Sequence, residues 1–213
     1  MVSAWLQTLR ALRPTHVVTA LPRGSSLLLL SPRDLRRVEP APLARIEVPA
    51  LFLVAPILRA ARDAGALVGL RKPGALQGQG PSPGQFAAAV VRAAGELGFS
   101  APLWLSSAPL PVGLDERAGE RLRGEVQRFL DAGFTELALE GEATPSALGT
   151  GLYMVREREV PLAVVAHDVA AARPLLATDA ALATALAWAA WTTARRIGGW
   201  ISWPAENAAR KGA

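Results

Sequence analysis

The stretch that decides the fold is ALVGLRKPGALQGQGPSPGQFAAAVVRAAGELGFSAPLWLS, residues 66–106. Its two ends, 66–71 and 102–106, are short and apolar, as buried strands are. Between them, Ser82 and Gln85 have the spacing of a capping box, which predicts the start of a helix. This order of strand, helix and strand is the repeating unit of a parallel sheet.

The same alternation continues on both sides of this stretch. A helix is expected at 54–64, ending at Gly65, and another is expected to start at Ser31 and to end before Pro40 or Pro42. Further strands are expected at 15–21, 45–50, 134–139 and 161–166, and a long helix at 180–197. Because the strands are almost uniformly apolar, both faces of the sheet should be covered. We therefore expect an α/β fold of repeated βα units.

Composition narrows the class of protein. The chain has 213 residues, of which 51% are hydrophobic and 19% charged, so it can form a sizeable core. It has no cysteine, which excludes disulfides, thiolate metal sites and a cysteine nucleophile, and fits a cytoplasmic protein. The net charge of +5 comes from scattered arginines, and we expect no nucleic-acid binding. The uncharged run 180–194 is shorter than the ~20 residues of a spanning helix, so a membrane role is not favoured.

Three phrases in the middle of the chain carry a family resemblance. IEVPALFLVAPILRAARDAGALVGLRKP (46–73), GPSPGQFAAAVVRAAGELGF (80–99) and EVQRFLDAGFTELALEGE (125–142) occur in this order. Together they resemble the first half of class II fructose- and tagatose-bisphosphate aldolases, and most of all the non-catalytic subunit type of the tagatose-bisphosphate branch. The resemblance covers about residues 27–140. It implies an incomplete or modified TIM barrel of aldolase type with an extra C-terminal helix.

The resemblance also implies a division of the chain into three parts. Residues 1–26 would be an N-terminal extension, 27–170 an aldolase-like βα domain, and 171–213 a tryptophan-rich helix and tail.

The departures from the family pattern lead to a functional expectation. The family's Asp-His pair is replaced by Ser107 and Ala108, and two histidines cannot supply a three-histidine zinc site. We therefore expect no metal or other cofactor. The expected function is that of a pseudoenzyme without zinc-dependent aldol activity, serving carbohydrate metabolism as a structural, regulatory or ligand-binding subunit.

An alternative is an active sugar-phosphate lyase or isomerase with a rebuilt site. Glu140, His167 and Asp168 follow the strands expected at 134–139 and 161–166, where barrel enzymes carry their active sites. They are candidate catalytic residues. Each of them can equally be a solvated loop residue or a cap.

A second candidate site would hold a phosphate. Arg71 and Lys72 end the strand 66–71, and Ser107 ends the strand 102–106. With the backbone amides of the loop 72–84 they could bind the phosphate of a sugar phosphate. The same loop can also be a flexible connection without any ligand.

The C-terminal part carries four of the six tryptophans, namely Trp188, Trp191, Trp200 and Trp203. They could form the interface of a homo-oligomer or bind a partner protein, since interfaces favour such anchors. They could also lie on a membrane surface, or simply cover an open edge of the sheet.

Overall fold

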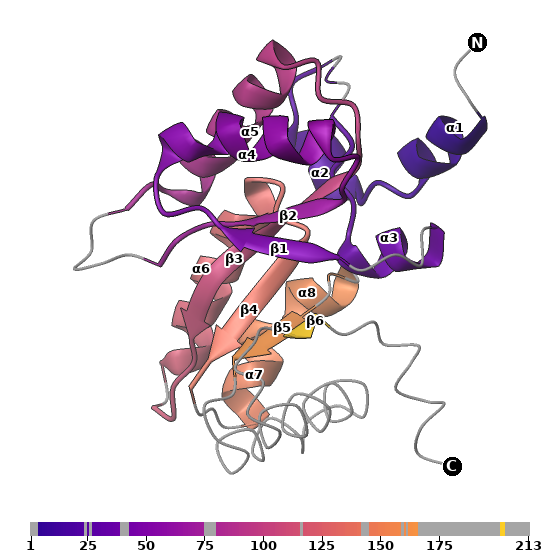
Figure 1. The fold of residues 1–213 in the computed structure, drawn as a ribbon. Coiled ribbons are helices and arrows are strands. Elements are labelled where there is room, and N and C mark those ends of the chain that lie inside the picture. Colours follow the sequence, from indigo (N-terminus) through magenta and orange to yellow (C-terminus); the bar gives the residue numbers. More distant parts are fainter. Residues whose placement is uncertain are drawn as a thin grey trace. The chain divides into compact units, whose positions relative to one another are not determined.

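The computed structural model describes residues 4–23, 25, 27–38, 43–74, 80–115, 117–141, 145–158, 160, 162–165 and 201–202 (Figure 1). The chain forms two compact units. Unit 1 comprises Met1–Ala108 and Arg128–Glu136, and unit 2 comprises Pro109–Gln127 and Leu137–Ala213. The division of the chain at residues 26 and 170 stays a prediction.

Unit 1 is built on parallel strands. β1 (Ala44–Glu47) pairs with β2 (Val68–Arg71), and β2 pairs with the first part of β3 (Leu103–Pro111). The register aligns Glu47 with Arg71 and Arg71 with Ser106. The extended segment before α3 joins β3 through a parallel bridge between Leu29 and Leu103. These pairings confirm the expected α/β fold of parallel βα units.

The helices of unit 1 follow from local signals in the sequence. α4 (Val54–Asp63) is preceded by the 3-10 turn Leu51–Leu53 and followed by Gly65, which adopts a φ of 61°. In α5 (Pro83–Glu96), Ser82 accepts a hydrogen bond from the backbone of Gln85, whose side chain accepts one from the backbone of Ser82. The expected capping box and helix are thus confirmed. Figure 1 shows α4 and α5 side by side next to β1 and β2.

The N-terminal part of unit 1 holds one error of the sequence analysis. The helix α1 (Ala4–Ala11) is followed by a second helix, α2 (Thr15–Ala20), where a strand was expected. The β-branched residues favoured a strand, but Pro14 is suited to start a helix, and His16 is buried with Nε2 at 2.9 Å from the carbonyl oxygen of Phe134. This distant tertiary contact outweighs the local preference.

The core of unit 1 includes a cluster around Trp104. Its members are Leu9 of α1, Leu28 and Leu30 of the bridging segment, and Leu35 of α3 (Pro32–Val38). The indole ring of Trp104 lies directly over Gly69 of β2, where a Cβ atom would overlap it. A glycine in the strand therefore allows a large aromatic ring to lie against the neighbouring backbone.

Unit 2 contains three strands: β4 (Glu136–Glu140), β5 (Leu162–Val165) and β6 (Ile201–Ser202). The first residue of β4, Glu136, is counted with unit 1. β4 and β5 are parallel, and β6 is antiparallel to β5. The last part of β3 also belongs here, because β3 extends to Pro111 rather than ending near Ser106 as expected. The amide of Val112, just after this strand, donates to the carbonyl oxygen of Glu140 at 2.9 Å.

The helices of unit 2 are α6 (Ala118–Asp131), α7 (Pro145–Gly151) and α8 (Tyr153–Glu157). The last residues of α6, from Arg128 onward, belong to unit 1. Within unit 1 the strands follow one another in the order β1-β2-β3, and within unit 2 in the order β4-β5-β6. The helix expected at 180–197 lies outside the described residues.

Candidate functional site

A row of polar side chains crosses the carboxyl ends of the strands in unit 1. Glu47, Arg71 and Ser106 are register partners on β1, β2 and β3. Register partners in a parallel sheet project from the same face, and neighbouring strands lie about 4.8 Å apart. The three side chains are therefore neighbours. We call these three residues together with Trp104 the Arg71 row, because Trp104 precedes Ser106 by two positions and points to the same face.

The charge at the centre of the Arg71 row is a buried guanidinium. The side chain of Arg71 is 6% exposed, and its Nη1 lies 3.5 Å from Oε2 of Glu47. The side chain of Glu47 is 52% exposed, so the pair joins an interior cation to a carboxylate at the surface. Solvent screens such a pair, and its contribution to stability is correspondingly small.

Two hydrogen-bonding groups in the Arg71 row have no partner among the described residues. Ser106 is 0% exposed and Trp104 is 2% exposed. Neither the Oγ of Ser106 nor the Nε1 of Trp104 makes a hydrogen bond within the described part of the chain. Buried polar groups are nearly always hydrogen-bonded, so such exceptions point to a bound ion, water or ligand. Both groups can donate a hydrogen bond, as can Arg71.

The other residues of the expected phosphate site lie outside the Arg71 row. Ser107 follows Ser106 in β3, and successive residues of a strand point to opposite faces, whereas Lys72 comes directly after the end of β2. Both are buried, and Nζ of Lys72 donates to the carbonyl oxygen of Pro73 at 3.0 Å. The structure thus places Arg71, Lys72 and Ser107 at the carboxyl ends of β2 and of its pairing with β3, with Ser107 on the face opposite to Ser106. Their role in ligand binding stays a prediction.

Another buried ion pair of unit 1 is formed within the protein, although Oε1 of its Glu136 has no hydrogen-bond partner among the described residues. Nη1 of Arg45 lies 2.6 Å from Oε2 of Glu136, whose side chain is 0% exposed. Each charge compensates the other, as buried charges require. We assign this pair to the stability of the unit rather than to a site.

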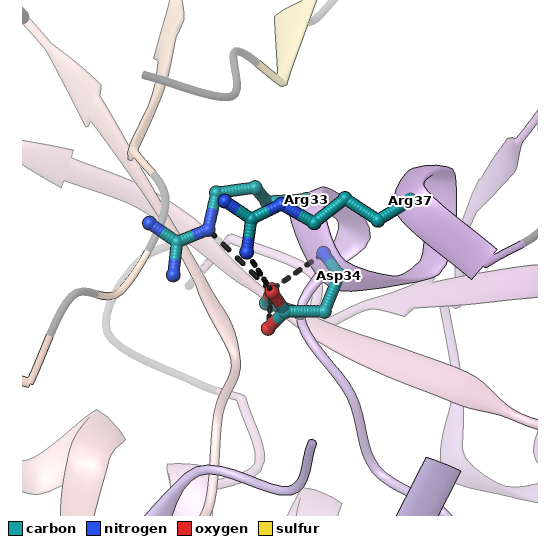
Figure 2. A network of polar contacts seen from close by, with 4 residues as sticks. Arg33, Asp34 and Arg37 are labelled. Carbon is teal, nitrogen blue, oxygen red and sulfur yellow. Dashed lines mark hydrogen bonds and ion pairs between the residues drawn. The ribbon is translucent and has the colours of Figure 1, made fainter. Parts of the chain in front are cut away.

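A polar network at the start of α3 is also structural (Figure 2). The Oγ of Ser31 donates to Oδ2 of Asp34 at 2.6 Å and accepts from the Asp34 amide at 3.0 Å. Arg33 and Arg37 each form an ion pair with Oδ1 of Asp34, at 3.6 Å and 3.4 Å. The expected helix start is confirmed, and its carboxylate is occupied by capping and by the two arginines.

The remaining predicted residues are placed only in part. Glu140 ends β4 in unit 2 and is half-buried. Outside the described residues lie His167, Asp168 and the four tryptophans, Trp188, Trp191, Trp200 and Trp203. The predicted catalytic group and the predicted oligomer or partner interface therefore stay predictions. Among the described residues, no three His, Asp or Glu side chains are grouped so that they could hold a metal ion.

Two interactions on the surface of unit 2 shift pKa values. Arg121 forms a bidentate ion pair with Asp115, and its hydrogen bond lowers the pKa of the Asp115 carboxyl. The same hydrogen bond raises the pKa of Arg121. In α8, the hydrogen bond to Glu157 raises the pKa of Tyr153. These groups are solvent-exposed and form no enclosed site.

Sequence reasoning missed Glu47, Trp104 and Ser106. The signal was present in part, because each lies in or next to a strand that was correctly expected. Which of them are neighbours depends on strand register, however, and register is set by long-range pairing.

Comparison with known proteins gives one partial match. Over 64 residues the chain is 59% identical to a protein of Mycobacterium tuberculosis named alkyl hydroperoxide reductase. The match spans 30% of this chain and only 17% of that protein. No protein-family model matches the chain. In the described part of the chain, no helix combines the length and apolar character needed to cross a membrane.

The match overturns the expected family. The resemblance to class II aldolases is wrong, since the finding is similarity to an alkyl hydroperoxide reductase. The expectation of an aldolase-like pseudoenzyme in carbohydrate metabolism is wrong with it, and the lyase, isomerase and membrane or partner-binding alternatives receive no support. The short phrases that suggested aldolases are helix-to-strand connections that βα units share, which explains the error. The chain is thus similar, over less than a third of its length, to a protein named alkyl hydroperoxide reductase.

Proposed function

We propose that unit 1 binds a small oxyanion at the Arg71 row. The observation that carries this proposal is the Oγ of Ser106, which is fully buried and has no hydrogen-bond partner among the described residues, on the register partner of the buried Arg71. An oxyanion oxygen would accept from this hydroxyl and from the guanidinium at once. Hydrogen bonds of this charge-assisted kind are about twice as strong as neutral ones.

The chemistry of the row favours an anion over a metal ion. Arg71 cannot lose its proton in a protein, so it repels a cation and attracts an anion. The indole of Trp104 can only donate a hydrogen bond. The position supports the same reading, because ligands of open α/β sheets bind outside the carboxyl ends of the strands.

We do not extend the name of the partial relative to an activity of this chain. Reduction of a peroxide by a protein thiolate needs a cysteine, which is oxidised in the reaction. The 213 residues contain none. An assay of the purified chain with an alkyl hydroperoxide and a dithiol reductant should therefore show no peroxide consumption above the reductant alone.

The binding proposal is tested by titrating the chain with sodium acetate and with sodium phosphate against sodium chloride at equal ionic strength. The readout is the indole N–H resonance of Trp104 in a proton–nitrogen correlation spectrum, assigned with Trp104→Phe. We expect saturable movement of this resonance, since the indole gains an acceptor, and its loss in Arg71→Lys and Ser106→Ala. Arg59→Met removes an exposed arginine of α4 in the same unit and should bind like the wild type. A linear, unsaturable response shared by all variants would refute the site.

For the fold and the location, we further propose a TIM-type arrangement and a cytoplasmic protein. Within each unit the parallel strands follow one another in chain order, which supports the first, because doubly wound sheets reverse their order at a switch point. The lack of cysteine supports the second. An experimental structure with a reversed strand order would refute the barrel, and localisation of a tagged chain would decide the compartment.

A further inference from the structure

The Arg71 row offers an oxyanion one positive charge. Arg71 is the cation of the row, and the neighbouring Lys72 lies after the end of β2, with Nζ bonded to the carbonyl oxygen of Pro73. The other donors, Ser106 and Trp104, are neutral. A singly charged carboxylate matches this set, because the planar guanidinium fork fits its two oxygens.

Glu47 adds a negative charge at the entrance to the row. Its carboxylate lies 3.5 Å from Nη1 of Arg71, whereas the buried pair of Arg45 and Glu136 lies at 2.6 Å. Glu47 is also half-exposed, so its side chain can turn into water at little cost. Arg71 is buried and cannot follow. An incoming anion can therefore replace Glu47 at Arg71, but the displaced carboxylate remains attached to β1 close by.

We propose that Glu47 makes the site selective for a carboxylate monoanion over a phosphate dianion. This inference rests on the proposed oxyanion site and names its ligand class. A monoanion replaces the charge of Glu47 at Arg71 one for one. A dianion brings an excess negative charge next to Glu47, and electrostatic repulsion grows in proportion to that charge.

The test uses acetate and inorganic phosphate, at a pH where phosphate is mainly a dianion, with the wild type, Glu47→Gln and Glu96→Gln. Glu96 is an exposed residue of α5, so its variant carries the same change in net charge away from the row. In Glu47→Gln we expect acetate affinity to rise about two- to five-fold, the range of a screened surface pair. Phosphate affinity should rise by roughly the square of that factor, because the repelled charge is doubled. Glu96→Gln should leave both affinities unchanged.

The possible outcomes separate this inference from the binding proposal. If the wild type binds acetate through Arg71 and Ser106 but Glu47→Gln behaves like Glu96→Gln, the role of Glu47 is refuted and the site remains. If neither anion binds to the wild type or to Glu47→Gln, both proposals fail. A gain in affinity cannot come from damage to the fold, and an unchanged urea unfolding midpoint of Glu47→Gln confirms that the variant is folded. A gain for phosphate no larger than that for acetate refutes the selectivity.

Discussion

Replacing Gly69 with alanine tests the placement of Trp104, on which the Arg71 row depends. A Cβ atom at position 69 would lie well inside 3.0 Å of three atoms of the indole ring, a separation that real Cβ atoms essentially never show. The ring would have to withdraw by about 1 Å or more to reach ordinary van der Waals contact. Trp104 is 2% exposed and packed against Leu9, Leu28, Leu30 and Leu35, so it has little room to move.

The expected cost follows from this geometry. Forcing an extra methyl group into a packed core destabilises by about 1–3 kcal/mol. Gly69 has no positive φ, so alanine itself is tolerated there by the backbone, and it gains about 0.4–1 kcal/mol from a less flexible unfolded chain. We expect Gly69→Ala to lower the free energy of unfolding by about 1–2 kcal/mol, the difference of these two terms.

The assay is urea unfolding followed by far-UV circular dichroism and by tryptophan fluorescence. The matched control is Gly95→Ala in α5, where a Cβ would meet nothing within 4 Å. This control should raise the free energy of unfolding by about 0.5–1 kcal/mol, because alanine favours a helix. The two variants should therefore differ in sign. A Gly69→Ala variant as stable as the wild type, or a double variant with Trp104→Leu that shows no coupling, would mean that the ring does not lie over Gly69.

Two further predictions concern other charged and polar pairs. Arg45→Met should lower the free energy of unfolding by about 3–5 kcal/mol, because it leaves the buried carboxylate of Glu136 without its partner charge. Adding Glu136→Leu should restore most of this loss. Equal urea unfolding midpoints for the single and the double variant would contradict the prediction. Tyr153 is the chain's one tyrosine, so phenolate absorbance reports its titration alone. The hydrogen bond to Glu157 raises the pKa of Tyr153, so the titration midpoint should lie above the ordinary tyrosine value in the wild type and fall in Glu157→Gln. Because the folded pKa is raised, the stabilisation by this hydrogen bond is full below the unfolded pKa and is lost as pH rises through the folded value; identical titrations of the two proteins would refute the pair.

Local sequence signals were enough for several elements of the fold. The spacing of Ser82 and Gln85 fixed the start of α5, and Gly65 marked the end of α4, because caps depend on residues a few positions apart. The segment 15–20 shows the limit of such signals. Its β-branched residues favour a strand, yet His16 is held by a carbonyl group 118 positions away. β3 also continues through residues 107–111, beyond the strand expected at 102–106, although two of these residues are prolines.

Only part of the candidate site could be predicted from the sequence. The end of an expected strand identified Arg71, but its neighbour in the chain, Lys72, lies beyond the end of β2 and bonds to the carbonyl oxygen of Pro73. Ser106 becomes its partner through the register of β2 with β3, and Glu47 through the register of β1 with β2. A shift of one residue in either pairing would have brought Ser107 or Val48 to that face instead. Hydrophobic pattern alone does not determine such a register where both faces of a strand are apolar.

The stability and binding experiments examine the same indole ring from two sides, and together they separate structure from function. If Gly69→Ala is destabilising and acetate moves the Trp104 resonance, the ring is placed as described and its N–H serves a ligand. If Gly69→Ala is destabilising but no anion moves the resonance, the ring placement stands but the oxyanion site is refuted. The buried hydrogen-bond donors of Trp104 and Ser106 then lower the stability of the fold without binding a ligand. Ser106→Ala should then raise the free energy of unfolding, because it removes a buried hydroxyl group that makes no hydrogen bond to any described residue.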